Sequence, residues 1–137
     1  MKYPDDCAEQ VTHSKITLQE KRVKVTFQNP DRKTIWKITI DGCALRQPVR
    51  SCDYGLWDEQ TEYYIELKGS DIPHGIEQLE STIKHLSSDA LKAEKKCYLI
   101  GGRIPQSATE IQTYKKRMRK QYNARLTVQK SGNTLPL

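Results

Sequence analysis

Apolar and polar residues alternate in several short stretches of the first half of the chain. Positions 23–27 and 36–40 carry apolar residues at every second place, which is the period of a strand with one buried face. The sequence Asn-Pro-Asp at 29–31 is a turn signal between them, so the two strands are expected to form a β-hairpin. Two further strands are expected at 49–57 and 63–68, separated by a polar stretch.

The apolar period changes from two to about 3.6 after Gly69. Five apolar residues at this spacing fall on one helical face, namely Ile72, Ile76, Leu79, Ile83 and Leu86. Ser70 or Asp71 can cap the N-terminus, and Pro73 stands in the first turn, where its missing N–H does no harm. The sequence therefore predicts an amphipathic helix over 72–86.

The last third of the chain predicts a strand, a helix and a strand. Positions 96–101 are typical of a short buried strand, and Ser107 or Thr109 can cap the helix that follows. The inward face of this helix carries Ile111, Tyr114, Met118 and Tyr122. A final strand is expected at 125–129. This order of elements predicts a mixed α/β fold, with a central mixed β-sheet flanked by helices.

The chain of 137 residues is expected to form a single domain over 1–137, because a second core would be too small to be stable alone. The core is expected at 22–130. The N-terminal segment 1–21 is polar and weakly periodic, with a helix around 6–10. Positions 131–137 are expected to be a loose tail.

Composition and charge narrow the class of protein. Hydrophobic residues make up 36% of the chain and charged residues 29%, as in an ordinary water-soluble domain. The longest apolar stretches, such as 97–100, are far shorter than the roughly 20 residues of a membrane-spanning helix. No apolar signal-peptide core follows Met1, so we expect a cytoplasmic protein without membrane contact. The formal net charge of +6 favours an anionic partner, most commonly nucleic acid.

The cysteines lack the spacing of a zinc ribbon or a thioredoxin-like site. They are Cys7, Cys43, Cys52 and Cys97. An even number allows disulfides in a secreted protein, but without a signal peptide we favour buried, reduced thiols.

Acidic residues and a lysine occupy two neighbouring expected strands. Asp53 lies in the third expected strand, and Glu66-Leu67-Lys68 lies in the next. Residues two apart on a strand share a face, so Glu66 and Lys68 project together. If Asp53 lies opposite on the neighbouring strand, two carboxylates reach one hard cation such as Mg²⁺ or Mn²⁺.

This pattern resembles the PD-(D/E)xK nuclease superfamily over roughly positions 34–100. The resemblance implies a restriction-endonuclease-like core and a Mg²⁺-dependent deoxyribonuclease in which Mn²⁺ can substitute. It implies that Asp53, Glu66 and the backbone carbonyl of Leu67 bind the metal. Lys68 is then expected to orient water or to stabilise the transition state.

The chain departs from the family pattern at two points. Cys52 stands where the motif has its proline, which is a common substitution. The family often adds a glutamate from a helix before the first strand, and only Glu9 and Glu20 are candidates upstream, neither in a convincing helix. Whether either acid joins the site stays open.

Three further residues are candidates for secondary roles. Some family members carry a glutamine on the following helix that holds metal-bound water or substrate, which suggests Gln78, and a polar surface position is the alternative. His74 at the helix start can reach the phosphate or the leaving group, or can be an ordinary surface residue. Asp41 can add an acid near the site, although Asp-Gly is also an ordinary turn.

Basic residues are concentrated in the second expected helix. The candidates for nucleic-acid contact are Lys115, Lys116, Arg117, Arg119 and Lys120. No acidic residue follows Glu110, which favours phosphate contacts that are independent of base sequence. A solvated helix face is the alternative.

The sequence therefore favours a metal-dependent nuclease that cuts DNA, as an endonuclease rather than an exonuclease, with RNA left open. A domain this small grips little duplex alone, so a homodimer is expected. The first alternative keeps the fold without catalysis, as a nucleic-acid-binding or protein-interaction module of a larger assembly. The second alternative is a protein that binds and inhibits another protein.

Overall fold

The computed structural model describes residues 1–67, 71–101 and 108–137. Within them the chain forms two α-helices, a mixed sheet of six strands and a second sheet of three strands. The six strands follow one another in the sheet as β1 (Ala8–Val11), β4 (Ile35–Thr39), β5 (Tyr54–Trp57), β6 (Glu62–Leu67), β7 (Lys95–Gly101) and β8 (Ala124–Lys130). The expected mixed α/β architecture is confirmed at this level.

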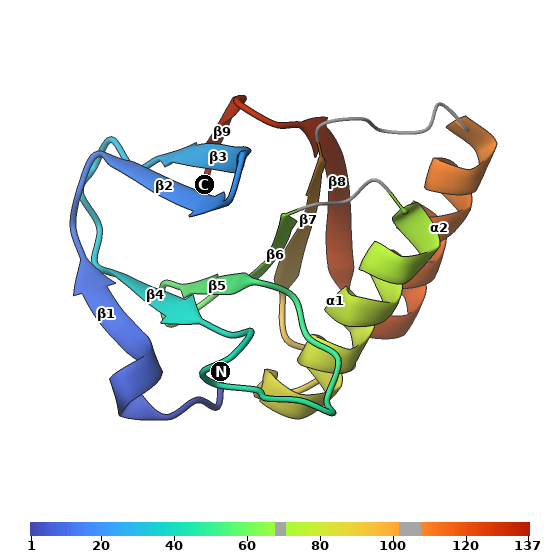
Figure 1. The fold of residues 1–137 in the computed structure, drawn as a ribbon, viewed down its shortest axis with the longest axis horizontal. Coiled ribbons are helices and arrows are strands. Elements are labelled where there is room, and N and C mark those ends of the chain that lie inside the picture. The colour runs from blue at the N-terminus through green and yellow to red at the C-terminus, as the bar shows by residue number, and fades with distance from the viewer. Residues whose placement is uncertain (68–70, 102–107) are drawn as a thin grey trace.

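Strand direction divides the large sheet into two halves. β1, β4, β5 and β6 pair antiparallel, whereas β6, β7 and β8 pair parallel. Parallel neighbours need a crossover connection. The helix α1 (Ile72–Leu86) connects β6 to β7, and α2 (Ala108–Tyr122) lies between β7 and β8. Both helices pack on the same face of the sheet (Figure 1).

The second sheet covers the opposite face of the large sheet (Figure 1). Its strands are β2 (Lys15–Glu20), β3 (Val23–Gln28) and β9 (Thr134–Pro136). Leu18 and Phe27 of this sheet form one buried cluster with Ile65 of β6. Ile76 of α1 and Tyr64 of β6 belong to a separate cluster beneath the helices. The central strand β6 therefore buries both of its faces, which explains the apolar run at its centre, 63–65.

The amphipathic helix expected over 72–86 is confirmed as α1. Asp71 is its N-cap, and the Asp71 side chain accepts a hydrogen bond of 3.1 Å from the His74 N–H. Gly75 lies close to β7, since a Cβ at this position would stand 2.4 Å from Cδ1 of Leu99. The capped first turn and the close approach at Gly75 fix α1 against the sheet.

The other elements of the second half agree with expectation apart from their bounds. The strands expected at 96–101 and 125–129 are confirmed as β7 and β8, and the helix between them as α2. Thr109 lies inside α2 rather than at its cap, and Ser107 lies outside the described residues. In the first half, the stretch expected as a strand over 49–57 is a strand only from Tyr54 onward.

The hairpin expected between 23–27 and 36–40 is wrong, although both strands exist. β3 pairs with β2 and β9, whereas β4 pairs with β1 and β5, so the two strands belong to different sheets. The buried side chain of Asn29 bonds to the backbone of His13 and Lys33 and shapes the connection. Alternation shows which face of a strand is buried, but it does not show which strand it pairs with.

Both ends of the chain are more regular than expected. The helix expected around 6–10 is wrong, because a 3₁₀ turn at Asp5–Cys7 is followed by β1, and β2 lies in the same segment. The expected loose tail at 131–137 contains β9, which pairs parallel with β3. All three strands lie at sheet edges, where pairing with a neighbour decides the structure more than local sequence does.

Cys7 and Cys43 form a disulfide, so the expectation of reduced thiols is wrong for this pair. The bond links the chain just before β1 to the turn after β4. Cys52 and Cys97 are buried free thiols, as expected. Structural disulfides persist mainly in oxidising compartments, and the cytoplasmic location stays a prediction. Neither α1 nor α2 is long and apolar enough to cross a membrane.

Candidate active site

Asp53 stands directly before β5 and is held by strands on both sides. Its N–H donates to the Ile65 carbonyl of β6 at 3.1 Å, and its carbonyl accepts from the Ile40 N–H, just after β4, at 3.0 Å. The residue is only 8% exposed. The backbone position of this acid is therefore set by the sheet and not by a free loop.

Glu66 on β6 is the neighbour of Asp53 across the ladder. The β5–β6 register pairs Tyr54 with Ile65, so the next pair along this antiparallel ladder is Asp53 with Glu66. The N–H of Leu67 donates to Oδ2 of Asp53 at 2.8 Å, and Glu66 is 6% exposed. The structure thus brings together the two acids of the sequence motif.

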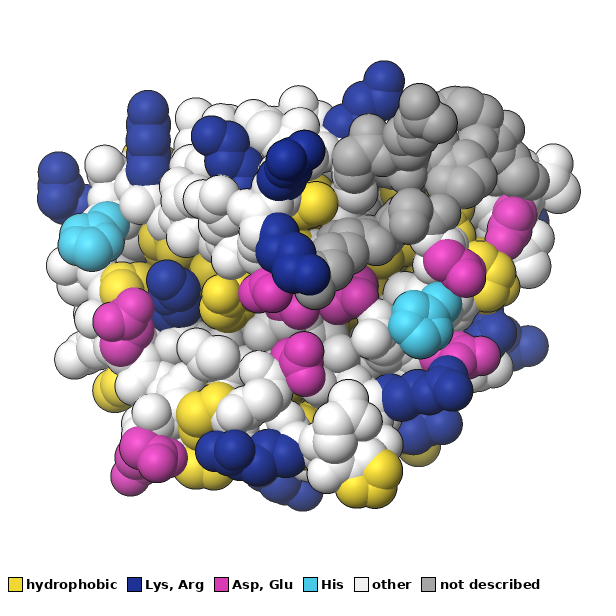
Figure 2. Space-filling view, in the orientation of Figure 1, with side chains coloured by type: hydrophobic (Ala, Val, Ile, Leu, Met, Phe, Trp, Pro, Cys, Tyr) yellow, Lys and Arg dark blue, Asp and Glu magenta, His cyan; other side chains and the backbone are white. Residues whose placement is uncertain are grey.

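Glu66 faces the helix side of the large sheet. Ile65 and Leu67 enter the cluster against the second sheet, whereas Tyr64 enters the cluster beneath the helices. Side chains alternate along a strand, so Glu66 shares the face of Tyr64. Figure 2 shows acidic side chains gathered near the centre of the molecular face that carries β5 and β6, with lysine and arginine side chains around them.

Two contacts tie the segment 50–53 to α1. The N–H of Cys52 donates to Oγ1 of Thr82 at 2.8 Å, and both groups are buried. Arg50 and Glu77 form an ion pair at the surface. Residues 50–52 are therefore anchored on the helix, and they deliver Asp53 to the start of β5.

Gln78 of α1 lies on the side of the helix that holds this segment. It precedes Thr82 by four residues, so the two share a helix face, and the Thr82 hydroxyl donates to the Gln78 carbonyl at 2.8 Å. Within the described residues, Oε1 of Gln78 and Oγ of Ser51 are buried and form no hydrogen bond. Buried polar atoms without a hydrogen bond are rare in native folds, and a ligand that binds there is one explanation for them. Ser51 was missed by sequence reasoning, since it has no motif signal beyond its place two residues before Asp53.

The thiol of Cys52 is neutral beside the two acids. Burial raises the pKa of Cys52 well above its ordinary value. The hydrogen bond with Thr82 lowers this pKa in part, and the nearby carboxylates of Glu66 and Asp53 raise it again. A buried neutral thiol is a poor nucleophile, so Cys52 packs the site without a chemical role.

The available ligands in the site are oxygen atoms, which fit the implied metal. The carboxylates of Asp53 and Glu66 and the amide oxygen of Gln78 are hard ligands that suit Mg²⁺ or Mn²⁺. In the part of the chain that the structure describes, no three side chains of His, Cys, Asp and Glu are grouped to hold a metal. Two carboxylates, supplemented by a backbone oxygen such as that of Leu67 and by water, are a usual protein ligand set for Mg²⁺.

The remaining predicted site residues are Lys68, His74 and Asp41. Lys68 lies outside the described residues. His74 is exposed in the first turn of α1. Asp41 is exposed in the turn after β4, where its N–H lies 3.4 Å from the Asp53 carbonyl. The backbone of Asp41 thus adjoins the acid pair, whereas no described contact links His74 to it.

The two candidates for a fourth acid lie in strands and not in a helix. Glu9 is on β1 and forms an ion pair of 3.7 Å with Lys37. Glu20 ends β2, and it raises the pKa of Tyr54 together with Asp53, after the larger effect of burial. Glu20 is therefore the one of the two that lies near the start of β5.

The basic residues of α2 have different surroundings. Arg117 binds the buried carboxylate of Glu80 on α1 through two guanidinium nitrogens. This residue therefore joins the two helices, and its charge is already compensated. The other predicted residues reach solvent or a cavity beside β8, and they are Lys115, Lys116, Arg119 and Lys120.

A comparison with protein-family models, curated proteins and solved structures finds no match to this chain. The chemistry of the site therefore rests on its own residues.

Proposed function

We propose that the protein is a Mg²⁺-dependent nuclease that hydrolyses phosphodiester bonds of DNA. The acid pair Asp53 and Glu66 binds the metal, together with the Leu67 carbonyl. In this proposal β4, β5, β6, α1 and β7 form a restriction-endonuclease-like core. The observation that carries the proposal is that two buried acids stand opposite each other on neighbouring strands, with the carboxylate of Asp53 bonded to the N–H of the residue after Glu66.

The carboxylates of Asp53 and Glu66 are close neighbours, so they repel each other when both are ionised. A hard divalent cation relieves this repulsion, and it supplies Lewis acidity and a water of lowered pKa for attack on the phosphate. The strands hold the carboxylates of Asp53 and Glu66 in fixed positions, and Gln78 offers an amide oxygen to a bound water. Lys68 orients the attacking water or stabilises the charge that develops on the phosphate.

The substrate in this proposal is DNA, cut internally, and the active form is a homodimer. A net charge of +6 supports a polyanionic substrate. A single domain of 137 residues covers little duplex, and a symmetric pair places one acid pair on each strand.

The test is cleavage of plasmid, linear duplex and single-stranded DNA in Mg²⁺, Mn²⁺ or EDTA. We expect metal-dependent cleavage by the wild type, with a loss of at least about a hundredfold in Glu66→Gln and Lys68→Ala, since both remove groups that act on the reacting phosphate. Lys84→Ala is the matched control, because Lys84 is an exposed lysine of α1, and this variant should cleave like the wild type.

Cleavage that persists in EDTA, or that survives in Glu66→Gln, contradicts the proposal. If the folded wild type binds DNA without cutting any substrate, the protein is instead a catalytically inactive binding module. Binding of another protein without DNA affinity or cleavage points to the inhibitor alternative.

A further inference from the structure

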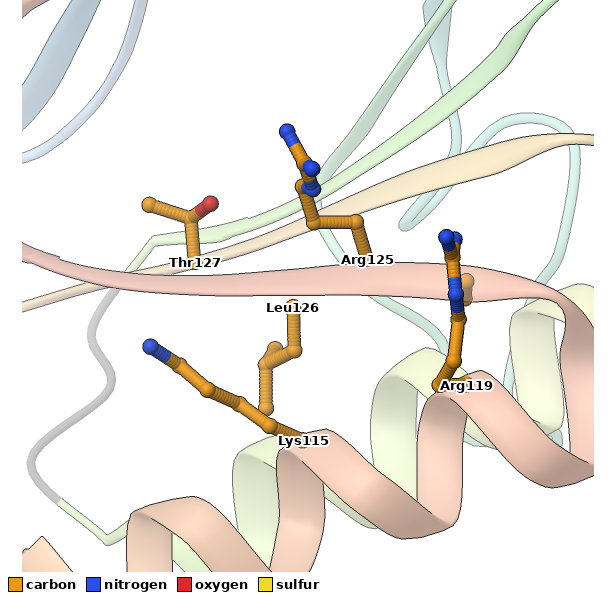
Figure 3. A pocket seen from close by; sticks show the side chains of 6 residues that line it. Lys115, Arg119, Arg125, Leu126 and Thr127 are labelled. Carbon is orange, nitrogen blue, oxygen red and sulfur yellow. The ribbon is translucent and has the colours of Figure 1, made fainter.

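A cavity of about 360 Å³ lies between α2 and β8, the last strand of the large sheet. Its lining combines cationic, apolar and hydroxyl groups, from Lys115, Arg119, Ala124, Arg125, Leu126 and Thr127. Figure 3 shows Lys115 and Arg119 extending from α2 toward β8, and Arg125 and Thr127 projecting from the strand on the side away from Leu126.

The geometry of the cavity follows from the turn between the two elements. α2 ends at Tyr122 and β8 begins at Ala124, so the chain reverses over one residue, Asn123. Lys115 and Arg119 are four residues apart and therefore lie on the same side of α2. The reversal lays this side against the first residues of β8, and Leu126 packs beneath the cations as part of the core.

The cations of the cavity are not compensated within the described part of the protein. No described acid lines the cavity, and Lys115, Arg119 and Arg125 form no ion pair with any described residue. Arg117 on the same helix differs, because it is bound to Glu80. Like charges held together are unfavourable, so an anion bound among them stabilises the arrangement.

We infer that this cavity binds a backbone phosphate of the nucleic acid, away from the acid pair. Lys115 supplies a charged donor on the helix side of β8, and Arg125 and the Thr127 hydroxyl supply donors on the other side, so the phosphate lies over the edge of this strand. The inference rests on the proposed function only in taking nucleic acid as the partner. The contact is to a phosphate, so it carries no base sequence information.

The sheet sets the distance between the cavity and the acid pair. The registers place Glu66, Leu99 and Val128 in one row across β6, β7 and β8, and Thr127 adjoins Val128. Neighbouring strands are about 4.8 Å apart, so the cavity lies roughly 10–15 Å from Glu66, or about three to four nucleotides along a duplex. One bound polynucleotide spans this separation, whereas a free phosphate ion does not.

The experiment measures binding of a fluorescently labelled DNA duplex by anisotropy, in EDTA so that cleavage does not interfere, at several salt concentrations. We expect Arg125→Ala and Lys115→Ala each to weaken binding by about eightfold at about 0.1 M salt. Each should reduce the slope of log affinity against log salt by about 0.9. Lys84→Ala is the matched control, because this exposed lysine of α1 does not line the cavity, and it should change the affinity less than twofold.

Wild-type affinity in both Arg125→Ala and Lys115→Ala overturns the inference, and so does an equal loss in Lys84→Ala, which indicates diffuse attraction. Circular dichroism confirms that each variant is folded, and Arg119→Ala replaces any variant that is not. If the cavity variants weaken DNA binding and the wild type does not cleave DNA, the phosphate site is supported and the nuclease proposal is contradicted. If the wild type cleaves DNA and the cavity variants bind it normally, the nuclease proposal is supported and the phosphate site is contradicted.

Discussion

The backbone N–H of Leu67 donates a hydrogen bond of 2.8 Å to Oδ2 of Asp53. The acid that is proposed to bind metal therefore also holds β6 in register with the start of β5. Structure and chemistry depend on different properties of the same side chain, because the hydrogen bond needs an acceptor oxygen and the metal needs a negative charge.

Asp53→Asn keeps an acceptor oxygen for the Leu67 N–H, whereas Asp53→Ala removes it and leaves a buried donor without a partner. We expect the alanine variant to be less stable than the asparagine variant by roughly 1–3 kcal/mol, measured as the free energy of unfolding in urea. Both variants should lose cleavage. Equal stability of the two variants contradicts the structural role of this hydrogen bond.

Gly75 and Leu99 set the distance between α1 and β7. Alanine at position 75 favours the helix by up to about 1 kcal/mol, but its Cβ would stand 2.4 Å from Cδ1 of the buried Leu99. We expect Gly75→Ala to destabilise the protein by roughly 1–3 kcal/mol, measured by thermal unfolding. The double variant Gly75→Ala, Leu99→Val should recover part of this loss, and a Gly75→Ala protein that melts above the wild type contradicts the close approach.

Glu62 is a buried acid, 1% exposed, at the opposite end of β6 from Glu66. Burial by itself raises the pKa of Glu62, but hydrogen bonds from Ser87, Ser88 and Tyr64 together bring it below the ordinary value of 4.5. Folding therefore favours the charged form of this carboxyl. Its contribution to stability is complete above about pH 4.5 and is lost as the pH falls through the lower folded-state pKa.

Glu62→Gln should therefore reduce stability at neutral pH by roughly 1–3 kcal/mol. The difference from the wild type should shrink as the pH is lowered below about 4.5. Urea unfolding at a series of pH values measures both effects, with the exposed Glu94→Gln as control. A difference that stays constant down to low pH shows that the charge of Glu62 is not the cause.

Arg117 is expected to act in stability and not in nucleic-acid binding, because it pairs with the buried carboxylate of Glu80. Arg117→Ala leaves that acid buried without its cation, at a cost of about 1–2 kcal/mol after allowance for the partial exposure of the arginine. Lys116→Ala removes the same charge from the same helix without this contact and should stay within about 0.5 kcal/mol of the wild type. Equal thermal stability of the two variants argues against a structural ion pair.

Local pattern predicts the interior elements of this fold well. The helical spacing of Ile72 to Leu86 and the cap at Asp71 are local features, and α1 follows them. The strands β6 and β7 contain apolar runs at 63–65 and 97–100, as expected for buried strands, whereas β8 alternates apolar and polar residues. The local pattern does not determine which distant segments pair. For this reason β3 was expected beside β4, and the edge strands β1, β2 and β9 were not predicted.

The candidate site likewise combines contacts that local pattern predicts with contacts between distant residues that it does not predict. The sequence predicted the meeting of Asp53 and Glu66 only on the condition that Asp53 lies opposite on the neighbouring strand, as the resemblance to a known motif implies, and the register of β5 and β6 meets this condition. The anchoring of segment 50–53 on α1 depends on the contact of Cys52 with Thr82, thirty residues apart, and no local signal marks it. The separation of Arg117 from its basic neighbours likewise depends on the distant Glu80.

Binding of Mn²⁺ to the folded protein, followed by the electron paramagnetic resonance signal of the free ion, tests most directly whether Asp53 and Glu66 form a metal site. We predict binding of Mn²⁺ by the wild type, weakened at least about tenfold in Asp53→Asn and in Glu66→Gln, since each removes one charged ligand. Glu77→Gln, which changes an exposed acid of α1, should bind Mn²⁺ like the wild type. The account is contradicted if the wild type binds no Mn²⁺, or if Glu66→Gln binds it with undiminished affinity.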